Sequence, residues 1–346
     1  MLAARLYGPR KIVIENINKP QINENELLVK IKSAAICGTD VRMYINGYEG
    51  IDENNPRVLG HEFCGVVDEV GKNVEHYREG MDVAIAPNIG CGICDRCTCG
   101  NGHLCDNYTA FGINMDGAFA EYVKVPEKAI KFGNLMEAPK GLKAEVIALN
   151  EPLSCAYNGS LQCGISPGDY VVIIGAGTIG IFHAKLAKMF GAAKVIMNDL
   201  SKERLDLCKK NEANIITYHG ENLNEFVMEM TEGKGADVCI TACPSAVVQK
   251  NSLNLMAYGG RINFFGGLPK EQQEVAINTN IIHYKQLIVT GTTRSSLSHF
   301  RKTLSFVAEG LIDLSGIVTG RFNLREIEKA FEYAENAVGL KNVIEF

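Results

Sequence analysis

The sequence predicts a two-domain α/β protein, with a β-rich, barrel-like first part and a second part built on a parallel sheet. Three observations lead to this prediction. A chain of 346 residues, of which 46% are apolar, is long enough for two hydrophobic cores. Short β-like runs separated by turns fill the first part, up to about residue 150. After that point strand-like and helix-like segments alternate, and this βαβ order forms parallel sheets.

Four short runs in the first part combine β-forming residues with flanking Gly, Pro and Asn turn signals. They are Leu27–Ile31, Gly65–Val70, Asp82–Ala86 and Ala120–Val125. So many short strands and turns in sequence are typical of an all-β or barrel-like body.

A cysteine-rich loop follows the third of these runs. Five of the chain's twelve cysteines lie within 91–105, and four of them have the spacing C-x2-C-x2-C-x7-C, namely Cys91, Cys94, Cys97 and Cys105. Four thiolates at this spacing can surround one tetrahedral Zn²⁺, and a site with four protein ligands has no open position, so this zinc would be structural. Cys99 is either an alternative ligand or a bystander.

A disulfide cluster is the alternative interpretation of this loop. The first nine residues lack the apolar stretch of a signal peptide, and the other seven cysteines are scattered singly along the chain. Because thiols stay reduced in the cytosol, this context favours a metal over disulfides.

A glycine-rich turn, Gly175-Ala-Gly177-Thr-Ile-Gly180, connects the apolar run Tyr170–Ile174 to a helix predicted over 178–190. The first glycine allows the tight turn, the second lets backbone N–H groups approach a pyrophosphate, and the third lets helix and strand pack closely. The positive end of the helix then faces the phosphates. This context predicts a dinucleotide site.

Asp199 suggests which dinucleotide is bound. It ends the next strand, Lys194–Asn198, and lies 19 residues after Gly180. A carboxylate there accepts hydrogen bonds from the adenosine ribose and repels a 2′-phosphate, which favours NAD. Lys202 and Arg204 lie nearby and leave NADP open.

The series of strands and helices continues to the end of the chain. The further segments are a helix over 202–210, the strands Asp237–Ile240, Arg261–Phe265 and Leu287–Thr290, two amphipathic helices after about residue 292, and the strand Asn342–Phe346. We expect this last stretch to pack back on the first domain.

The net charge of −5 comes from interspersed acidic and basic residues. The absence of a basic stripe argues against nucleic-acid binding. No stretch approaches the roughly 20 apolar residues that a membrane span needs. We therefore expect a soluble, cytoplasmic protein.

Three short segments outside the cysteine loop carry side chains of the kinds that bind metals. They are Cys37-Gly-Thr39-Asp40, Gly60-His61-Glu62 and Glu151-Pro-Leu153. Taken singly, each has an ordinary interpretation: a buried cysteine, a core histidine, or surface carboxylates.

The whole chain resembles the zinc-dependent medium-chain alcohol and polyol dehydrogenases. The resemblance rests on motifs in the family's order, namely Ala35-Ile-Cys-Gly-Thr-Asp40, Gly60-His-Glu-Phe-Cys-Gly65, Val70-Gly71, the four-cysteine loop, Gly117-Ala-Phe-Ala-Glu-Tyr122, Glu151-Pro-Leu153, the glycine turn and Asp199. The Glu-Pro-Leu form is similar to that of the sorbitol dehydrogenase branch, and threonine dehydrogenases are near relatives.

This resemblance implies a GroES-like, partly open β-barrel catalytic domain over 1–151 and 292–346. It implies a Rossmann domain with a doubly wound parallel sheet over 152–291. It also implies NAD, two zinc ions per chain (one catalytic and one structural), a small alcohol or polyol substrate, and a homodimer or homotetramer.

The resemblance assigns roles to individual residues. Cys37 and His61 would bind the catalytic zinc, with Glu62 or Glu151 completing the site directly, in exchange or through a water. The Thr39 hydroxyl would carry the alcohol proton away. The cofactor would contact Gly175, Gly177, Thr178, Ile179, Gly180, Asp199 and Arg204.

The chain departs from the family pattern after Cys37. Arg42 stands where many relatives have a histidine that ends the proton relay, and Met43 stands where sorbitol enzymes often have Tyr. Arg binds anions in a bidentate manner, so Arg42, with Arg294, could recognise a phosphorylated polyol. An ordinary ion pair is the alternative for both arginines. Cys64, His103 and Cys155 are interpreted as packing residues or as residues behind the ligands.

Oxidation of a polyol or sugar alcohol, free or phosphorylated, with NAD is therefore the leading functional hypothesis. L-threonine or a simple alcohol such as butanediol is the alternative substrate. A non-catalytic nucleotide-binding protein that senses zinc or redox state is the alternative of a different class, and it would need the Cys37, His61, Glu62 and Glu151 set to be accidental.

Overall fold

The computed structural model describes residues 1–346 and divides into two compact units. The first unit comprises Met1–Ser154 and Ser295–Phe346, and the second comprises Cys155–Arg294. Each junction lies three residues later than the boundary expected from the sequence. No helix in the structure is both long and apolar enough to cross a lipid bilayer.

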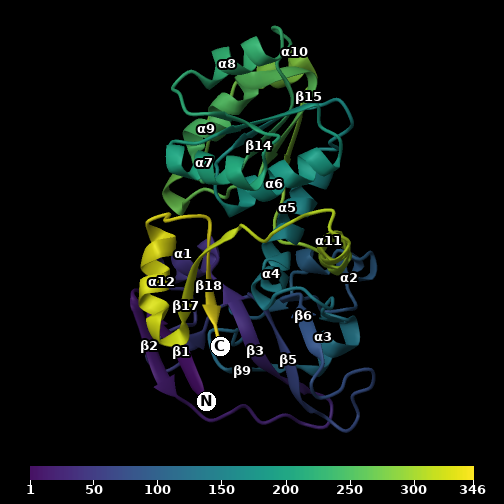
Figure 1. Ribbon diagram of the computed structural model, residues 1–346, viewed down its shortest axis with the longest axis vertical. Coiled ribbons are helices and arrows are strands. Elements are labelled where there is room, and N and C mark those ends of the chain that lie inside the picture. Colours follow the sequence, from purple (N-terminus) through teal and green to yellow (C-terminus); the bar gives the residue numbers. More distant parts are fainter. The chain divides into compact units, whose positions relative to one another are not determined.

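The first unit is built mainly from antiparallel strands (Figure 1). Its strands are β1 (Leu2–Gly8), β2 (Lys11–Asn16), β3 (Leu27–Ala35), β4 (Arg57–Val58), β5 (Glu62–Val70), β6 (Asp82–Ile85), β7 (Asn88–Ile89), β8 (Thr109–Ala110), β9 (Tyr122–Val125), β10 (Leu135–Glu137), β17 (Val318–Asn323) and β18 (Lys341–Glu345). Its helices are α1 (Gly38–Asn46), α2 (Asp95–Thr98), α3 (Glu127–Phe132), α4 (Ala144–Ala148), α11 (Leu297–Ala308) and α12 (Ile327–Glu335), with single 3-10 turns at Gly102–Leu104 and Leu324–Glu326. The boundary between the units falls within α5 (Asn150–Gln162).

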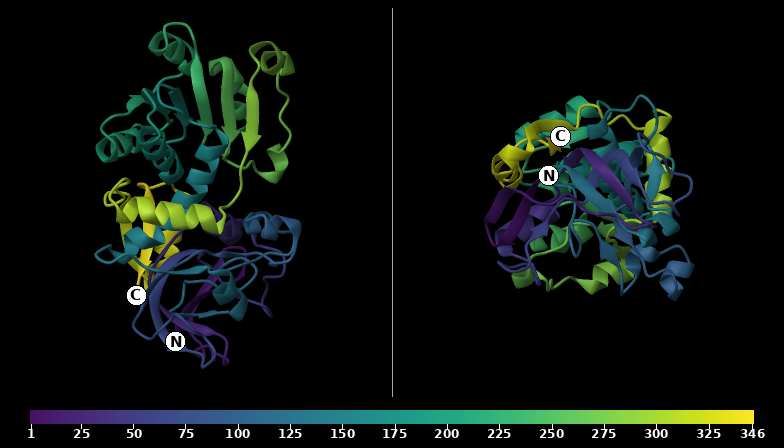
Figure 2. Two further views of the ribbon diagram at one scale, coloured as in Figure 1. Left: turned by 90° about the vertical axis from the view of Figure 1, so that its right-hand side faces the viewer. Right: turned by 90° about the horizontal axis from the view of Figure 1, so that it is seen from below.

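Strand β3 lies at the centre of the largest sheet of this unit. The sheet has the order β10-β6-β5-β3-β18-β17, and β9 also pairs with β3. Both ends of the chain lie in this unit (Figure 2), and β18 pairs antiparallel with β3. The C-terminal stretch therefore returns to the first unit, as the sequence suggested.

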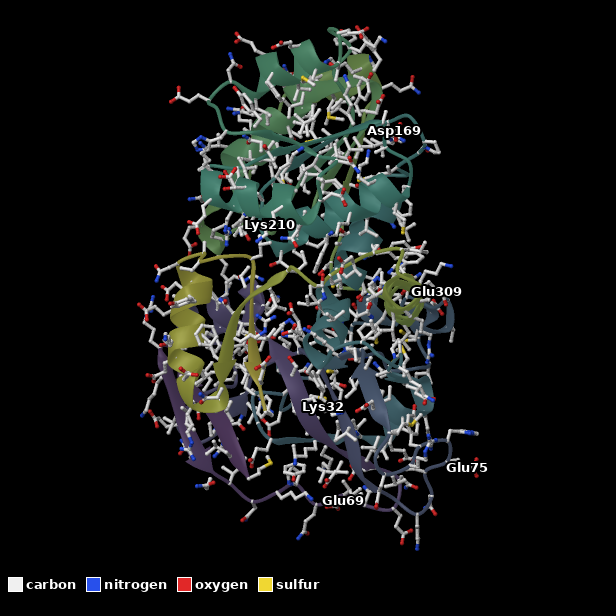
Figure 3. The ribbon with its side chains drawn as sticks, viewed as in Figure 1. Lys32, Glu69, Glu75, Asp169, Lys210 and Glu309 are labelled. Atoms are coloured by element: carbon white, nitrogen blue, oxygen red, sulfur yellow. The ribbon has the colours of Figure 1, made fainter.

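The stability of the first unit comes from its apolar core. The core includes Leu27, Ile31, Phe63, Phe119 and Phe331, all nearly inaccessible to solvent. Charged residues at its margins extend outward, as Glu69 and Glu75 do in Figure 3. Their exposed ion pairs contribute little, because solvent screens them.

The second unit is a single six-stranded parallel sheet with helices on both faces (Figures 1 and 2). Its strands are β11 (Tyr170–Ile174), β12 (Lys194–Asn198), β13 (Ile216–Tyr218), β14 (Ala236–Thr241), β15 (Met256–Phe264) and β16 (Ile288–Gly291). Its helices are α6 (Thr178–Met189), α7 (Lys202–Asn211), α8 (Leu223–Met230), α9 (Ala246–Ser252) and α10 (Thr279–Lys285), with 3-10 turns at Leu253–Leu255 and Lys270–Gln272.

The strand order of this sheet is β13-β12-β11-β14-β15-β16. Counted from β11, this is the order 3-2-1-4-5-6 of a dinucleotide-binding sheet, in which the strand order reverses between β11 and β14 while all strands stay parallel. Ligands of such sheets bind at the carboxyl ends of the strands beside that reversal, so the topology directs attention to the turn after β11.

Candidate metal centres and dinucleotide site

Three predicted metal ligands converge in the first unit. Cys37 precedes α1, His61 precedes β5, and Glu62 begins β5. Their ligand atoms all lie within 4.8 Å of one another. His61 and Glu62 are buried, and Cys37 is half-buried. A thiolate, an imidazole and a carboxylate in this arrangement form a donor set that suits Zn²⁺ and leaves room for a fourth, exchangeable ligand.

The Asp40 carboxylate contacts two of these ligands, Cys37 and His61. Its carboxylate accepts a hydrogen bond of 2.9 Å from the Cys37 N–H, which fastens the start of α1. Its other oxygen lies 3.3 Å from His61 Nδ1 and accepts a hydrogen bond of 3.2 Å from the Gly60 N–H. A carboxylate at Nδ1 orients the ring so that Nε2 faces a metal. Asp40 lies in the motif that begins at Cys37, but its role was not predicted from the sequence.

The charges around His61 oppose the effect of its burial. Burial lowers the pKa of an imidazole, but the Asp40 carboxylate and the Cys37 thiolate outweigh it and raise the pKa of His61 well above its usual value. A ring that must bind a metal is neutral, so metal binding here has to displace a proton.

The four-cysteine loop brings together the four predicted thiols. Cys91, Cys94, Cys97 and Cys105 have sulfur atoms within 4.8 Å of one another, and none forms a disulfide. Two of the Sγ–Sγ distances, Cys91–Cys97 and Cys94–Cys105, are 3.9 and 3.8 Å. Four sulfurs about 2.3 Å from one tetrahedral zinc would lie about 3.8 Å apart, so the loop fits that ion. Cys99 is exposed and lies outside the set.

Backbone groups of the loop favour a thiolate at Cys91. The N–H groups of Ile93 and Cys94 lower the pKa of Cys91 to about 6. The Cys97 N–H lowers the pKa of Cys94, but burial and the neighbouring cysteines outweigh it and raise this pKa to about 11. A thiolate is the form that binds a metal, so Cys91 is the thiol that the loop prepares for zinc.

The glycine turn of the second unit has the geometry that a dinucleotide requires. Gly175 has a φ of +115°, a value that side chains rarely tolerate. A Cβ on Gly180 would lie 1.8 Å from the Gly175 carbonyl oxygen, so only glycine lets α6 approach β11 this closely. Thr178 and Ile179 form the first turn of α6, with their N–H groups at the positive end of the helix.

Asp199 and Arg204 adjoin this turn. Asp199 accepts hydrogen bonds from the N–H groups of Ala176, at 2.6 Å, and Ser201, at 2.8 Å. The Arg204 guanidinium lies 3.8 Å from the position that a Cβ would take on Gly177. Asp199 and Arg204 therefore lie next to the glycine turn, at the carboxyl ends of β11 and β12.

Comparisons with known proteins identify the family of this chain. The family model described as the alcohol dehydrogenase GroES-like domain matches residues 23–134, and the one described as zinc-binding dehydrogenase matches residues 178–309. The L-threonine 3-dehydrogenase of Bacillus licheniformis is 38% identical over 320 residues, which are 90% of this chain and 89% of that protein. The sorbitol dehydrogenase of Bacillus subtilis is 31% identical over 337 residues, 96% of this chain and 93% of that protein.

A solved zinc-binding dehydrogenase from Sinorhizobium meliloti 1021, bound to NADP, is 31% identical. It superimposes with a TM-score of 0.89 over 100% of this chain and 99% of that one. This chain belongs to the zinc-dependent medium-chain dehydrogenase family. The predicted fold class, a GroES-like domain with a Rossmann domain, is confirmed, and so is the prediction of an oxidoreductase.

One residue beside the candidate metal ligands of this dehydrogenase was not predicted from the sequence. Lys341, in β18, has its Nζ 2.5 Å from Glu62 Oε2. It is buried, which lowers the pKa of an amine, but Glu62, Cys37 and Glu151 together raise the pKa of Lys341 above its usual value. Strand pairing explains its position, because Val343 of β18 and Glu62 of β5 both pair with Ala35 of β3.

Glu151 lies buried in the first turn of α5. It is near enough to Lys341 to raise the pKa of that amine, but it does not belong to the set of ligand atoms formed by Cys37, His61 and Glu62. Arg294 belongs to the second unit, where its carbonyl accepts a hydrogen bond of 2.9 Å from Asn158 Nδ2.

Thr39 and Arg42 lie on the first turns of α1, next to Cys37. Thr39 is half-buried and Arg42 is exposed. Arg42 Nη2 donates a hydrogen bond of 3.0 Å to Thr39 Oγ1. The position after it, Met43, is buried in the core of the first unit.

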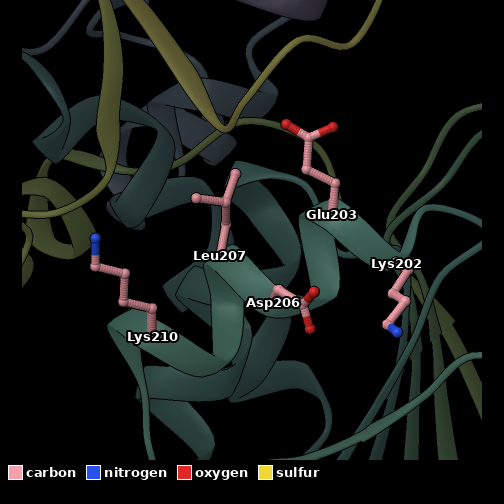
Figure 4. Close-up of a pocket in the computed structure, with 5 residues that line it drawn as sticks. All are labelled: Lys202, Glu203, Asp206, Leu207 and Lys210. Carbon is pink, nitrogen blue, oxygen red and sulfur yellow. The ribbon is translucent and has the colours of Figure 1, made fainter.

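A shallow hollow of about 490 Å³ lies on the face of α7 in the dehydrogenase's second unit (Figure 4). Its lining residues all come from this helix and are Lys202, Glu203, Asp206, Leu207 and Lys210. Alternating charges on one helix face are typical of a solvated surface, so we assign no ligand to this hollow.

Proposed function

We propose that this dehydrogenase oxidises a secondary alcohol with NAD at a zinc held by Cys37, His61 and a glutamate. The convergence of these side chains, with Asp40 behind His61, is the observation that carries the proposal. The alcohol loses a hydride from carbon to the nicotinamide and a proton to solvent, which yields a ketone, NADH and H⁺. Bound zinc would lower the pKa of the alcohol hydroxyl.

Glu62 is the carboxylate that we assign to the metal. Its Oε2 faces Lys341, while its Oε1 is buried and accepts no hydrogen bond. A buried carboxylate oxygen without a partner is costly, and a cation beside Cys37 and His61 would compensate it. In this assignment Glu151 adds negative charge to the site. It would reach the metal only through a water or by exchange with Glu62.

We expect Glu62→Gln to weaken catalytic zinc binding by about tenfold to a hundredfold, and Glu151→Gln to weaken it less. Competition with a chelator, followed by counting zinc per chain, measures both. Since Glu62→Gln leaves Lys341 unpaired, the double variant Glu62→Gln/Lys341→Met is the control that separates loss of metal from a buried lone charge. Greater zinc loss from Glu151→Gln would assign the ligand to Glu151 instead.

The substrate we favour carries an anionic group near its hydroxyl, with L-threonine as the first candidate. The L-threonine 3-dehydrogenase of Bacillus licheniformis is a close relative, and an exposed guanidinium beside Thr39 suits a carboxylate. A phosphorylated polyol is the second candidate, because the sorbitol dehydrogenase of Bacillus subtilis is also a relative and Arg binds phosphate in the same manner.

For the cofactor we favour NAD. Asp199 lies beside Gly175–Gly177, where its carboxylate would accept the ribose hydroxyls and repel a 2′-phosphate. The relative from Sinorhizobium meliloti was solved with NADP, so both cofactors belong in the assay. We also propose two zinc ions per chain, which metal analysis tests. We propose a homodimer or homotetramer, which sedimentation tests.

The deciding experiment offers matched substrates to the zinc-loaded protein with NAD⁺ and with NADP⁺. L-threonine is paired with its methyl ester, and sorbitol with sorbitol 6-phosphate; 2,3-butanediol serves as a neutral alcohol. We expect kcat/KM at least about tenfold higher for the anionic member of a pair, since a charged hydrogen bond contributes about 1.5–3 kcal/mol. Equal or better turnover of the neutral members would reject anion recognition, and no turnover of any alcohol would reject the proposed reaction.

A further inference from the structure

Thr39 lies in the first turn of α1, two residues after the candidate metal ligand Cys37. Cys37 precedes the helix, and its N–H donates to the Asp40 carboxylate, so the first turn is fastened at both sides of Thr39. Arg42 lies three residues later, on the same face of the helix, and its Nη2 reaches Thr39 Oγ1 at 3.0 Å.

A guanidinium donates hydrogen bonds and accepts none, because it has no free lone pair and keeps its proton at every pH the protein encounters. Thr39 Oγ1 must therefore be the acceptor in this contact. The hydroxyl hydrogen then points away from Arg42 toward another acceptor. No protein group accepts that hydrogen in the structure, so it is available to a ligand.

We infer that Arg42 is a positioning residue that fixes the Thr39 hydroxyl as a hydrogen-bond donor to the reacting oxygen of the substrate. The inference rests on the proposed function and adds a role that differs from a proton relay. The Thr39 hydroxyl would donate a hydrogen bond to the substrate oxygen as negative charge develops on that oxygen. Because this donor is already oriented, it stabilises the charge without a rearrangement of the site. No proton passes from Thr39 to Arg42, because Arg42 cannot accept one.

This role is separable from recognition of an anionic substrate. Positioning uses Nη2 and affects any alcohol, charged or neutral. Anion recognition uses the remaining, solvent-exposed nitrogens and affects only charged substrates. A neutral ligand therefore reports on positioning alone.

The test uses trifluoroethanol, a neutral alcohol that ionises more readily than ordinary ones. Its binding to the zinc-loaded enzyme with NAD⁺ is measured by titration calorimetry, together with kcat for 2,3-butanediol. The variants are Arg42→Met, Arg42→Lys, Thr39→Val and the double variant Thr39→Val/Arg42→Met. Arg42→Met removes the donors at similar length, and Arg42→Lys keeps a charged donor.

We expect Arg42→Met to raise the trifluoroethanol dissociation constant about fivefold to tenfold, and Arg42→Lys to restore part of the loss. Thr39→Val should weaken binding at least as much, and the double variant should bind no more weakly than Thr39→Val alone, since both changes remove one interaction. Unchanged binding and kcat in Arg42→Met, or effects that multiply in the double variant, would overturn the inference.

If the proposed function is wrong, these measurements give a result that differs from failure of the Arg42 inference alone. If the wild-type protein neither binds trifluoroethanol nor oxidises 2,3-butanediol, the alcohol site itself is wrong and the inference falls with it. If the wild type binds trifluoroethanol normally but prefers no anionic substrate, anion recognition fails while the positioning role stands on the variants.

Discussion

Replacing Cys37 with serine should lower kcat/KM for alcohol oxidation by about a thousandfold or more. The cysteine supplies the thiolate of a cluster in which His61 and Glu62 provide the other donors. Serine stays protonated at neutral pH and is a poor ligand, so the metal is lost or misplaced, and its contribution of several kcal/mol to catalysis is lost with it. Steady-state kinetics and zinc content on the same sample measure both effects, and we expect zinc to fall from two ions per chain to one.

Cys64 offers a matched control for this variant. It is also a buried cysteine, in β5, and its Sγ donates a hydrogen bond of 3.1 Å to the Ala144 carbonyl, a role that a serine hydroxyl can retain. Cys64→Ser should therefore keep both zinc ions and most of the activity. If Cys37→Ser keeps full activity with two zinc ions, the catalytic metal does not bind where we place it.

Replacing Cys105 with serine should destabilise the first unit without acting on the chemistry directly. Cys105 is buried, and its sulfur accepts the Cys91 N–H at 3.3 Å while lying 3.8 Å from Cys94 Sγ. With one thiolate missing, a closed four-sulfur site loses its zinc, and loss of a structural metal costs about 4 kcal/mol or more. For a unit of this size we expect the melting temperature to fall by about 10 °C or more.

Cys99 gives the control within the same loop. It is exposed and lies outside the four-sulfur set, so Cys99→Ser should leave the melting temperature and the zinc content unchanged. A strong chelator added to the native protein should reproduce the Cys105→Ser destabilisation slowly, after the catalytic zinc has gone. Equal destabilisation by both serine variants would mean that the loop binds its metal through a different set of sulfurs.

The second unit was largely predictable from the sequence because its signals are local. Buried parallel strands are short apolar runs, and the predicted Tyr170–Ile174 and Lys194–Asn198 are β11 and β12 in the structure. Strand β13 (Ile216–Tyr218) was missed, since it is a half-buried edge strand of three residues with little apolar pattern. In the first unit, the hairpin of β1 and β2 was missed for a similar reason, because half-buried strands mix polar and apolar residues.

Some residues around the candidate metal site could be predicted from the sequence, and others could not. Cys37, His61 and Glu62 were found through motifs, because their neighbours in sequence carry a recognisable pattern. Lys341 has no such pattern around it, and only the pairing of β18 with β3 brings it to Glu62. The position of Lys341 next to Glu62 depends on the register of strands that are distant in sequence, and local propensity does not encode that register. The contact between Arg42 and Thr39 was equally hidden, since a side-chain rotamer decides it.

The place of Lys341 in the chain has a consequence for how the protein acquires its metal. Cys37, His61 and Glu62 are synthesised about 280 to 300 residues before Lys341. A growing polypeptide therefore presents the thiol, imidazole and carboxylate with no resident ammonium, and a dissolved divalent cation meets no competitor for Glu62. Once β18 has paired with β3, an entering ion must share that carboxylate with Lys341. We therefore expect zinc to bind the growing chain and the finished protein at different rates.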